Sequence, residues 1–537
     1  MPLPIHSQGR RGLRLLVALG LGLAGSSCVN QHFFQPDARV GPGSSEFLPV
    51  AADSVQAVAG RQYARHSAPY RLLLGPHYRT VWAAPVPAPV FRLATAAPDG
   101  LAPGKPGGGY QSISTTLEGR HGRQYALRAL DKDPRKTLPP WLRPTFVLNV
   151  VRDATAAAIP YGALTVPPLA AAAGVPHATP RLVYIRPDET GLGELSAKFA
   201  GKLALLEEKF SVRASATPDL AGVDRFVGGE NMLRSVYTHP SYGIDQRAFL
   251  RARLLDVWLG DWDRHEGQWQ WAAFDEPGGR VRYQPIPKDR DQVYFRFDDG
   301  LVPWLASRRF IAPQFQTFRS RYDNVAGLVY QAQFIDQRGL SAMTRADFQR
   351  LARDLQSRLP DSVIDRAMHA LPPAVYALEG PRLAAALRAR RTALPQAAEA
   401  YYRSLAREPN LGGTAEPERF VVRRYPDSTT VRVYSPALGR LPGADSLRFQ
   451  RTYFPAETKA LELDGLGGDD VFDVATLGQS AMRLRLYGGA GHDQLRLQGS
   501  GRRVQLFDDA SDLTAAGTHR PSLPRKKRRA YDRLNDD

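Results

Sequence analysis

The stretch 259–291, LGDWDRHEGQWQWAAFDEPGGRVRYQPIPKDRD, decides the fold of this chain. Apolar residues at helical spacing just before it predict a helix over 245–258. Residues 269–273 and 280–286 alternate as strands do, and the segment 275–279 between them has the composition of a turn. We therefore expect a helix, a polar loop, a β-hairpin and an acidic loop, in that order.

A hairpin brings its two ends together, so the loops that flank it are expected to meet. Asp263 and Gln268 in the first loop then face Asp289 and Asp291 in the second. Such a set suits metal-assisted phosphoryl transfer, in which one carboxylate orients the acceptor hydroxyl while an amide and another carboxylate hold magnesium. Gln268 also lies five residues after Asp263, the offset at which kinases place a metal-binding Asn.

The same stretch resembles the catalytic loops of atypical kinases, namely the HipA type, the type II phosphatidylinositol kinases, the secreted Golgi casein-kinase type and above all the CotH spore-coat kinases. In these families Asp-Arg-His or a close variant opens the loop and an amide follows, as Asp263, Arg264, His265 and Gln268 do here. The run 287–291, PKDRD, is similar to the CotH run that contains the metal Asp. The alternative is a loop of surface ion pairs with its tryptophans in the core.

The resemblance implies a two-lobed kinase-like domain that uses ATP with Mg²⁺ or Mn²⁺. The roles it implies for the two loops are Asp263 as catalytic base, Arg264 and His265 as residues that shape the loop, Gln268 and Asp289 as metal ligands, and Asp291 as the alternative ligand.

The segment before this hairpin predicts a small lobe. Gly107, Gly108 and Gly109 form a flexible loop ahead of two strands, and glycine loops let backbone amides approach phosphates closely. The remaining nucleotide-binding residues we expect are Arg128 or Lys132 on the phosphates, Asp153 as the helix acid that pairs with that cation, and Glu207 where the last strand meets the hinge. For Arg128 and Asp153 the alternative is a charged residue on a solvated face.

Composition and the N-terminus predict a secreted, lipid-anchored protein. Lys and Arg outnumber Asp and Glu to give a net charge of +18, which suits anionic envelope components rather than nucleic acid, since no nucleic-acid motif is present. Basic residues, a short apolar run and then Cys28, the sole cysteine, resemble a bacterial lipoprotein signal. The alternative is an ordinary secretory signal. We expect membrane attachment through lipidated Cys28 at the bacterial cell envelope, where an outer-membrane protein is a further candidate partner.

The C-terminal third changes to strand periodicity and contains two Gly-Asp turns that resemble the repeat-in-toxin pattern. Such turns offer carboxylate and carbonyl oxygens to Ca²⁺. The calcium ligands we expect are Asp464, Asp469, Asp470 and Asp493. A strand pair separates the two turns in the sequence, so we expect them not to stack in tandem, and the alternative is two hairpin turns without an ion.

The predicted fold class is α+β, a two-lobed kinase-like domain followed by a small all-β domain of β-roll or sandwich type. The predicted segments are a signal peptide (1–27), a tether (28–65), the kinase-like domain (66–408, with lobes 66–208 and 209–408), the β domain (415–510) and a basic disordered tail (511–537).

Two functions are open on these grounds. One is an envelope-anchored atypical kinase, with nucleotidyl transfer or a lipid acceptor as variants of its chemistry. The other is a catalytically inactive surface scaffold with a calcium-stabilised β domain.

Overall fold

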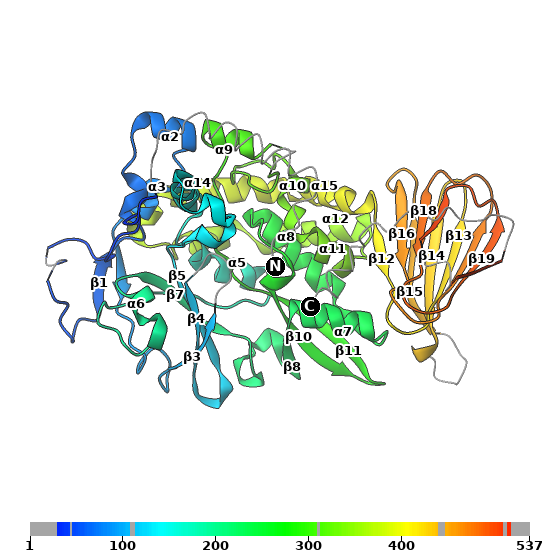
Figure 1. Cartoon of the computed structure of the whole chain (residues 1–537), viewed down its shortest axis with the longest axis horizontal. Helices are drawn as coiled ribbons and strands as arrows, with labels where there is room; N and C mark the ends of the chain where they lie inside the picture. Colours follow the sequence, from blue (N-terminus) through cyan, green and yellow to red (C-terminus); the bar gives the residue numbers. More distant parts are fainter. Residues whose placement is uncertain are drawn as a thin grey trace.

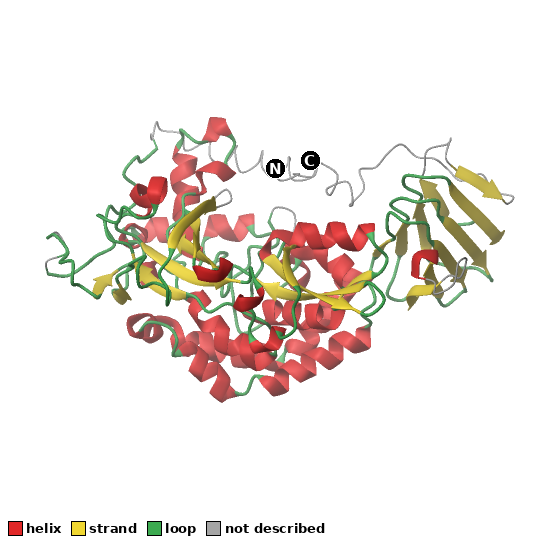
Figure 2. Ribbon diagram, turned by 90° about the horizontal axis from the view of Figure 1, so that it is seen from below, coloured by secondary structure: helices red, strands yellow, loops and turns green. Residues whose placement is uncertain are grey.

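The computed structural model describes residues 29–42, 44, 46–107, 113–308, 312–438, 446–507 and 513–516. Cys28, Gly108 and Gly109 lie outside these residues, so the predicted lipidation site and most of the glycine loop receive no structural account. The described chain mixes helix and sheet, as expected for the α+β class. A helix-rich part with three sheets is followed by a sandwich of strands at one end of the molecule (Figures 1 and 2).

An antiparallel sheet occupies the predicted small lobe, with strand order β3-β4-β5-β7-β6. Its strands are β3 (Ala102–Gly107), β4 (Ser114–Glu118), β5 (Gln124–Ala129), β6 (Arg181–Tyr184) and β7 (Leu203–Lys209). One face is apolar because alternate side chains such as Leu117, Leu127 and Leu206 are buried there against Phe199. The residues between β5 and β6 include α4 (Phe146–Asp153) and α5 (Val166–Ala173).

The predicted hairpin is confirmed. It lies in a second sheet of order β8-β10-β11-β9, whose strands are β8 (Arg225–Gly228), β9 (Tyr242–Ile244), β10 (Trp269–Glu276) and β11 (Arg280–Pro287). The helix before it, α8 (Gln246–Leu259), begins at Asp245, whose side chain accepts from the Ala248 amide, and ends at Gly260 in the left-handed region at φ +70°. Trp269 and Trp271 of the hairpin are buried against Phe249 of α8, and the buried Trp258 donates to the Leu387 carbonyl at 3.0 Å.

The remaining α-helices complete the helix-rich part, and most of them contribute to its main core. They are α2 (Ala68–Leu74), α3 (Arg79–Trp82), α6 (Ser196–Phe199), α7 (Gly229–Thr238), α9 (Leu301–Ala306), α10 (Val325–Leu328), α11 (Gln333–Gly339), α12 (Arg345–Arg358), α13 (Asp361–Met368), α14 (Pro373–Thr392) and α15 (Leu394–Ala406). By length and hydropathy the helical stretch Phe146–Ala173 could span a membrane, but 72% of its most apolar window is buried inside the protein. Its apolar side chains are therefore covered by packing, as in a core helix.

The predicted tether is wrong for the residues that the structure describes. Strand β1 (Ser54–Ala57) pairs antiparallel with β2 (Val86–Pro89). The Ala38 amide donates to the Gly201 carbonyl at 2.7 Å, and the buried Tyr63 hydroxyl donates to Asp131 at 2.6 Å. The Pro and Gly residues of this segment suggested a flexible linker, whereas the pairing of β1 with β2 attaches the segment to the domain.

The C-terminal strands form a coil in which the chain passes alternately between two sheets. The order is β12-β16-β18-β20 in one sheet and β15-β14-β13-β17-β19-β21 in the other. The bounds are β12 (Asn410–Gly412), β13 (Arg419–Arg424), β14 (Thr429–Ser435), β15 (Ser446–Tyr453), β16 (Ala460–Asp464), β17 (Val471–Thr476), β18 (Arg483–Tyr487), β19 (Asp493–Gly499), β20 (Val504–Phe507) and β21 (Leu513–Ala516). Neighbouring strands are parallel except in the pairs β13–β14 and β14–β15, which are antiparallel because β14 and β15 form an inserted hairpin. We call this unit the β-roll.

Two expectations for the β-roll need correction. The Gly-Asp turns do stack, because each joins one sheet to the other in successive coils, and Gly467 pairs with Ala490 across them. Residues 513–516 of the predicted disordered tail form β21, which pairs with β19. The rest of that tail lies outside the described residues.

Candidate active site

Arg264 fixes the shape of the loop that carries Asp263. Its guanidinium is fully buried and donates to the backbone carbonyls of Gln268 at 3.1 Å and Lys288 at 2.6 Å. It also lies over the Trp269 ring, with the guanidinium carbon 4.7 Å from the ring centre. Because Lys288 belongs to the second loop, Arg264 ties the two loops together at the end of the hairpin.

Asp289 in the second loop has a strained backbone. Its φ is +53°, a value that residues other than glycine rarely adopt and that concentrates at functional sites. The Lys288 amide donates to the Gln268 carbonyl at 3.0 Å, and Trp269 pairs with Pro287. Gln268 and Asp289 therefore lie one residue out of register at the same end of the hairpin.

Asp263 and Asp289 interact, and their pKa values move in opposite directions. Burial raises the pKa of Asp263 and the Asp289 carboxylate adds to the rise, while His265, whose Nε2 is 3.9 Å from Asp263 Oδ1, opposes them. Burial also disfavours the ionised form of Asp289, but Arg128 and Lys132 keep its pKa below the usual value. One carboxylate is thus suited to accept a proton while the other stays ionised.

The two predicted phosphate-binding cations each have a carboxylate partner. Arg128 on β5 forms an ion pair with Glu207 on β7, and Lys132 forms one with Asp291. The second oxygen of Asp291 accepts from the Gln292 amide at 2.9 Å. Protein groups thus satisfy both oxygens of Asp291. Glu207 lies within β7 as the partner of Arg128, two residues before the strand ends at Lys209.

The expected role of Asp153 is wrong. Its carboxylate accepts from both terminal nitrogens of Arg79 at 2.6 Å each, from His66 at 2.9 Å and from the Tyr70 hydroxyl at 3.1 Å. All four of these hydrogen bonds to the Asp153 carboxylate come from residues 66–79, and none comes from Arg128. The short Asp side chain, on the last residue of α4, is held by the buried Arg79 instead.

Two lysines that the sequence analysis missed, Lys209 and Lys288, add positive charge near Arg128. Burial, together with the nearby Arg128 and Lys209, lowers the pKa of Lys288 to about 8. Lys209 Nζ contacts the Thr116 hydroxyl at 3.4 Å, and burial lowers its pKa as well. Lys288 directly precedes Asp289 in the sequence, and this position could have identified it as a residue of the site.

A buried charge network under the loops was also missed. Arg253 on α8 donates to Asp336 at 2.7 Å and to Asp256 at 2.7 Å, and Arg290 pairs with Asp256 and, at 3.1 Å, with Asp261. Burial opposes the ionisation of Asp256, but Arg290 holds its pKa below the usual value, whereas burial raises the pKa of Asp261 to about 6. Since Arg290 follows Asp289 directly, the network sets the course of the second loop.

In the β-roll, three acids stack on successive coils. The Glu418 amide donates to Asp470 Oδ1 at 2.8 Å, and the Asp470 amide donates to Asp493 Oδ1 at 3.0 Å. Burial raises the pKa of Asp470 to about 10, and the backbone hydrogen bond from Glu418 only partly offsets this. Asp470 Oδ2 is buried without a hydrogen-bond partner. We call Glu418, Asp470 and Asp493 the acid ladder.

The other two predicted calcium ligands lie at the edges of this ladder. Asp464 is buried and accepts from the Leu466 amide at 3.2 Å, and the exposed Asp469 accepts from the His492 amide at 2.8 Å. Glu418 was missed, although Gly412-Gly413 and then Phe420 surround it as the glycines and Leu495 surround Asp493. The inserted β14–β15 hairpin concealed that repeat.

Neither site contains a ready-made cage of acidic or histidine ligands. Within the described residues there is no group of three or more His, Cys, Asp or Glu side chains placed to hold a metal ion. A metal at the hairpin would therefore depend on Asp289, an amide oxygen and ligand phosphates. Gly107 is the last residue of β3, and Gly108 and Gly109 lie outside the described residues.

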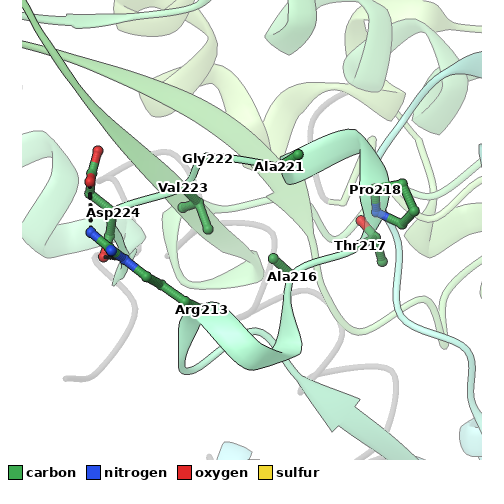
Figure 3. A pocket seen from close by; sticks show the side chains of 8 residues that line it. All are labelled: Arg213, Ala216, Thr217, Pro218, Ala221, Gly222, Val223 and Asp224. Atoms are coloured by element: carbon green, nitrogen blue, oxygen red, sulfur yellow. Dashed lines mark hydrogen bonds and ion pairs between the residues drawn. The ribbon is translucent and has the colours of Figure 1, made fainter.

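A separate surface hollow of about 490 Å³ lies in the segment 213–224 that precedes β8 (Figure 3). The Arg213 guanidinium and the Asp224 carboxylate form an ion pair of 2.7 Å at its edge. None of the predicted site residues lines it, so it is distinct from the hairpin site.

No protein-family model and no curated protein matches the chain. Among solved structures, the chain is similar to the Rio2 kinase–ADP/Mg²⁺–phosphoaspartate complex from Chaetomium thermophilum, with 16% identity over 48% of this chain and 70% of that chain. The TM-score of 0.20 makes this a weak likeness to a kinase-like fold. The interpretation of the site therefore depends on its own geometry.

Proposed function

We propose that this chain is a kinase-like phosphotransferase that uses ATP with Mg²⁺ or Mn²⁺ on an acceptor hydroxyl. The observation that carries the proposal is geometric: the loops that hold Asp263, Gln268 and Asp289 are tied together at one end of the β10–β11 hairpin, and the opposite pKa shifts of the two carboxyl groups support it. Phosphoryl transfer needs this division, a proton acceptor beside a permanently charged metal ligand.

The donor set fits a hard divalent cation. Asp289 is ionised, and within the described residues no side chain donates a hydrogen bond to its carboxylate or to the Gln268 side-chain oxygen. Carboxylate and amide oxygens are the ligands that magnesium and manganese prefer. When bound, the cation would neutralise charge on the phosphate oxygens.

The chain's own groups divide the remaining work. Asp263 accepts the proton of the acceptor hydroxyl and orients that group toward the phosphate. Arg128 and Lys132 hold the phosphates, each exchanging part of its contact with Glu207 or Asp291 for phosphate oxygens. Arg264 is a positioning residue, because it is fully buried and binds backbone carbonyls of both loops.

The test is ATP turnover and nucleotide binding by the purified protein with Mg²⁺ or Mn²⁺. Asp263→Asn is expected to lower turnover by about 10²–10⁴-fold while nucleotide binding persists. Asp289→Asn is expected to remove the metal dependence of binding. Asp275→Asn, at the exposed far end of the same hairpin, is the matched control. Metal-independent binding by the wild type, or equal turnover in all three variants, would refute the proposal.

We also infer that the protein is attached to the bacterial envelope through a lipid on Cys28, with anionic envelope components or an outer-membrane protein as partners. The support is the order of basic, apolar and cysteine residues at the N-terminus and the net charge of +18. Mass spectrometry of the envelope-extracted protein tests this: an acylated N-terminal Cys28 is expected, and an unmodified or internal Cys28 contradicts it.

A second candidate is a catalytically inactive surface scaffold with a calcium-stabilised β-roll. The observation that favours it is the acid ladder, in which Asp470 has an unpartnered buried oxygen beside two further carboxyl groups. Calcium is then expected to raise the melting temperature, and the Asp469→Ala/Asp493→Ala variant is expected to lose that rise. Thermal shifts with Mg²⁺-ATP but not with calcium would favour the phosphotransferase alone.

A further inference from the structure

Two short helices from distant parts of the chain expose large apolar side chains on one face. Helices α2 and α9 lie beside each other at the top edge of the view in Figure 1. Leu72 is 74% exposed, Trp304 is 44% exposed, and Leu73, Leu301 and Leu305 are exposed to a similar degree as Trp304. We call these five residues the apolar face.

The apolar face is rigid, because the two helices are joined where one ends and the other begins. A side chain on Gly300 would overlap the backbone of Gly75, so only glycine permits this approach. Asp299 forms an ion pair with His77 at 2.6 Å and accepts from the His77 amide at 2.8 Å. The exposed leucines and Trp304 therefore form one surface rather than two independent loops.

The two segments that contain these helices are rich in arginine, and the nearby acids Asp153 and Asp299 are already paired with Arg79 and Arg296. Residues 61–82 and 300–322, which contain the two helices, include eight arginines and no Asp or Glu. Arg65, Arg71 and Arg308 are exposed, and the structure pairs none of them with a carboxylate of the residues it describes. Arg308 lies over the Trp304 ring at 3.6 Å, an arrangement of cation and aromatic ring typical of the membrane–water interface.

The N-terminal end of the described chain lies near this surface. The Asn30 amide donates to the Asn149 side chain at 3.0 Å, on the helix whose last residue, Asp153, accepts from Tyr70 of α2. Four residues of helix span about 6 Å, and the two residues from Asn30 back to Cys28 span at most about 7 Å. A lipid on Cys28 would thus be anchored close to the apolar face.

We propose that the apolar face and its arginines dock on an anionic lipid surface, as a second contact beside the lipid on Cys28. Buried apolar side chains strengthen contact with a membrane in proportion to their area, and nearby arginines add attraction to anionic lipid head groups. This docking goes beyond the phosphotransferase proposal and does not depend on it.

The experiment measures vesicle binding by the chain that starts at Val29, which has no lipid and retains every described residue. Vesicles of phosphatidylcholine with phosphatidylglycerol are compared with vesicles of phosphatidylcholine alone. We expect binding to the anionic vesicles, weakened by salt, and at least about a tenfold loss of affinity in Leu72→Gln/Trp304→Gln/Leu305→Gln. The matched control is Leu447→Gln/Phe454→Gln, which removes two similarly exposed apolar residues of the β-roll and is expected to bind as the wild type does.

A measurement on the folded wild type protects the test against an unstable variant. Brominated lipid is expected to quench part of the tryptophan emission, and Trp304→Phe is expected to abolish that quenching. The proposal is overturned if the wild type ignores anionic vesicles, if the triple variant binds equally well, or if the control loses as much affinity. It is also overturned if the wild type is a dimer that the triple variant converts to monomers, since a second copy would then cover the face.

Discussion

Replacement of Asp470 by Asn measures how much the ionisation of this buried carboxyl group lowers the stability of the β-roll. The side chain is fully buried, burial raises its pKa from 3.8 to about 10, and Glu418, Asp493 and Asp464 add to the rise. The folded β-roll therefore binds this proton more tightly than the unfolded chain does. The stability linked to it is present below about pH 4 and is lost as the pH rises toward 10.

The magnitude follows from the size of that shift. The ordinary carboxyl pKa of 3.8 lies about three pH units below pH 7, and each unit is equivalent to about 1.4 kcal/mol, so the linkage costs about 4 kcal/mol at pH 7. Asn keeps an acceptor for the Glu418 amide, now at 2.8 Å, and directs its NH₂ group toward the neighbouring carboxyl groups. Asp470→Asn should stabilise the ion-free β-roll by up to that amount at pH 7 and change little near pH 4.

Hydrogen exchange read by mass spectrometry on peptides from residues 460–476 is the suitable assay, because it reports the local free energy of opening. The measurement is made in chelator and again in saturating calcium. If calcium occupies the ladder, the wild type gains protection that Asp470→Asn cannot gain. The control is Asp473→Asn in β17, the strand that follows Asp470. The Asp473 side chain pairs with Arg423 near the surface, so this change should alter protection little. Equal protection of Asp470→Asn and wild type in chelator at pH 7 would refute the reasoning.

Three further predictions concern the helix-rich part. Because the pKa of Asp263 is raised, turnover should rise with pH through a pKa above the ordinary carboxyl range; a profile that is flat across the acid range contradicts Asp263 as the base. Arg264→Met removes a buried cation from two loop carbonyls and should lower the free energy of unfolding by about 3–5 kcal/mol, measured by denaturant titration; a loss below about 1 kcal/mol contradicts the positioning role. Arg79→Met leaves Asp153 buried without its main partner and should destabilise by a similar amount, yet leave nucleotide affinity unchanged in calorimetry; weaker nucleotide binding at equal stability would restore Asp153 to the site.

Local patterns predicted the β10–β11 hairpin well. The helix over 246–259 begins and ends where a capping Asp and a left-handed glycine require, and the turn composition of 275–279 set the pairing of β10 with β11. Once that pairing is fixed, the ends of the hairpin must meet. Short-range chemistry therefore sufficed to bring Gln268 next to the loop of Asp289.

Other predictions failed because long-range contacts decide them. No sequence spacing links Asp153 to Arg79 or Arg128 to Glu207, which meet only after the small-lobe sheet and the N-terminal segment have packed. The same is true of residues 54–57, whose partner strand lies about thirty residues further along the chain.

The sequence by itself determined the order of elements, the hairpin and the two turns rich in glycine and aspartate, because hydrogen bonds and steric limits within a few residues select these conformations. The tertiary structure alone decided which charges are buried together. Burial changes the pKa of a carboxyl group only when distant segments close over it, so the opposite behaviour of Asp263 and Asp289 and the stacking of Glu418 on Asp470 arise only in the folded chain.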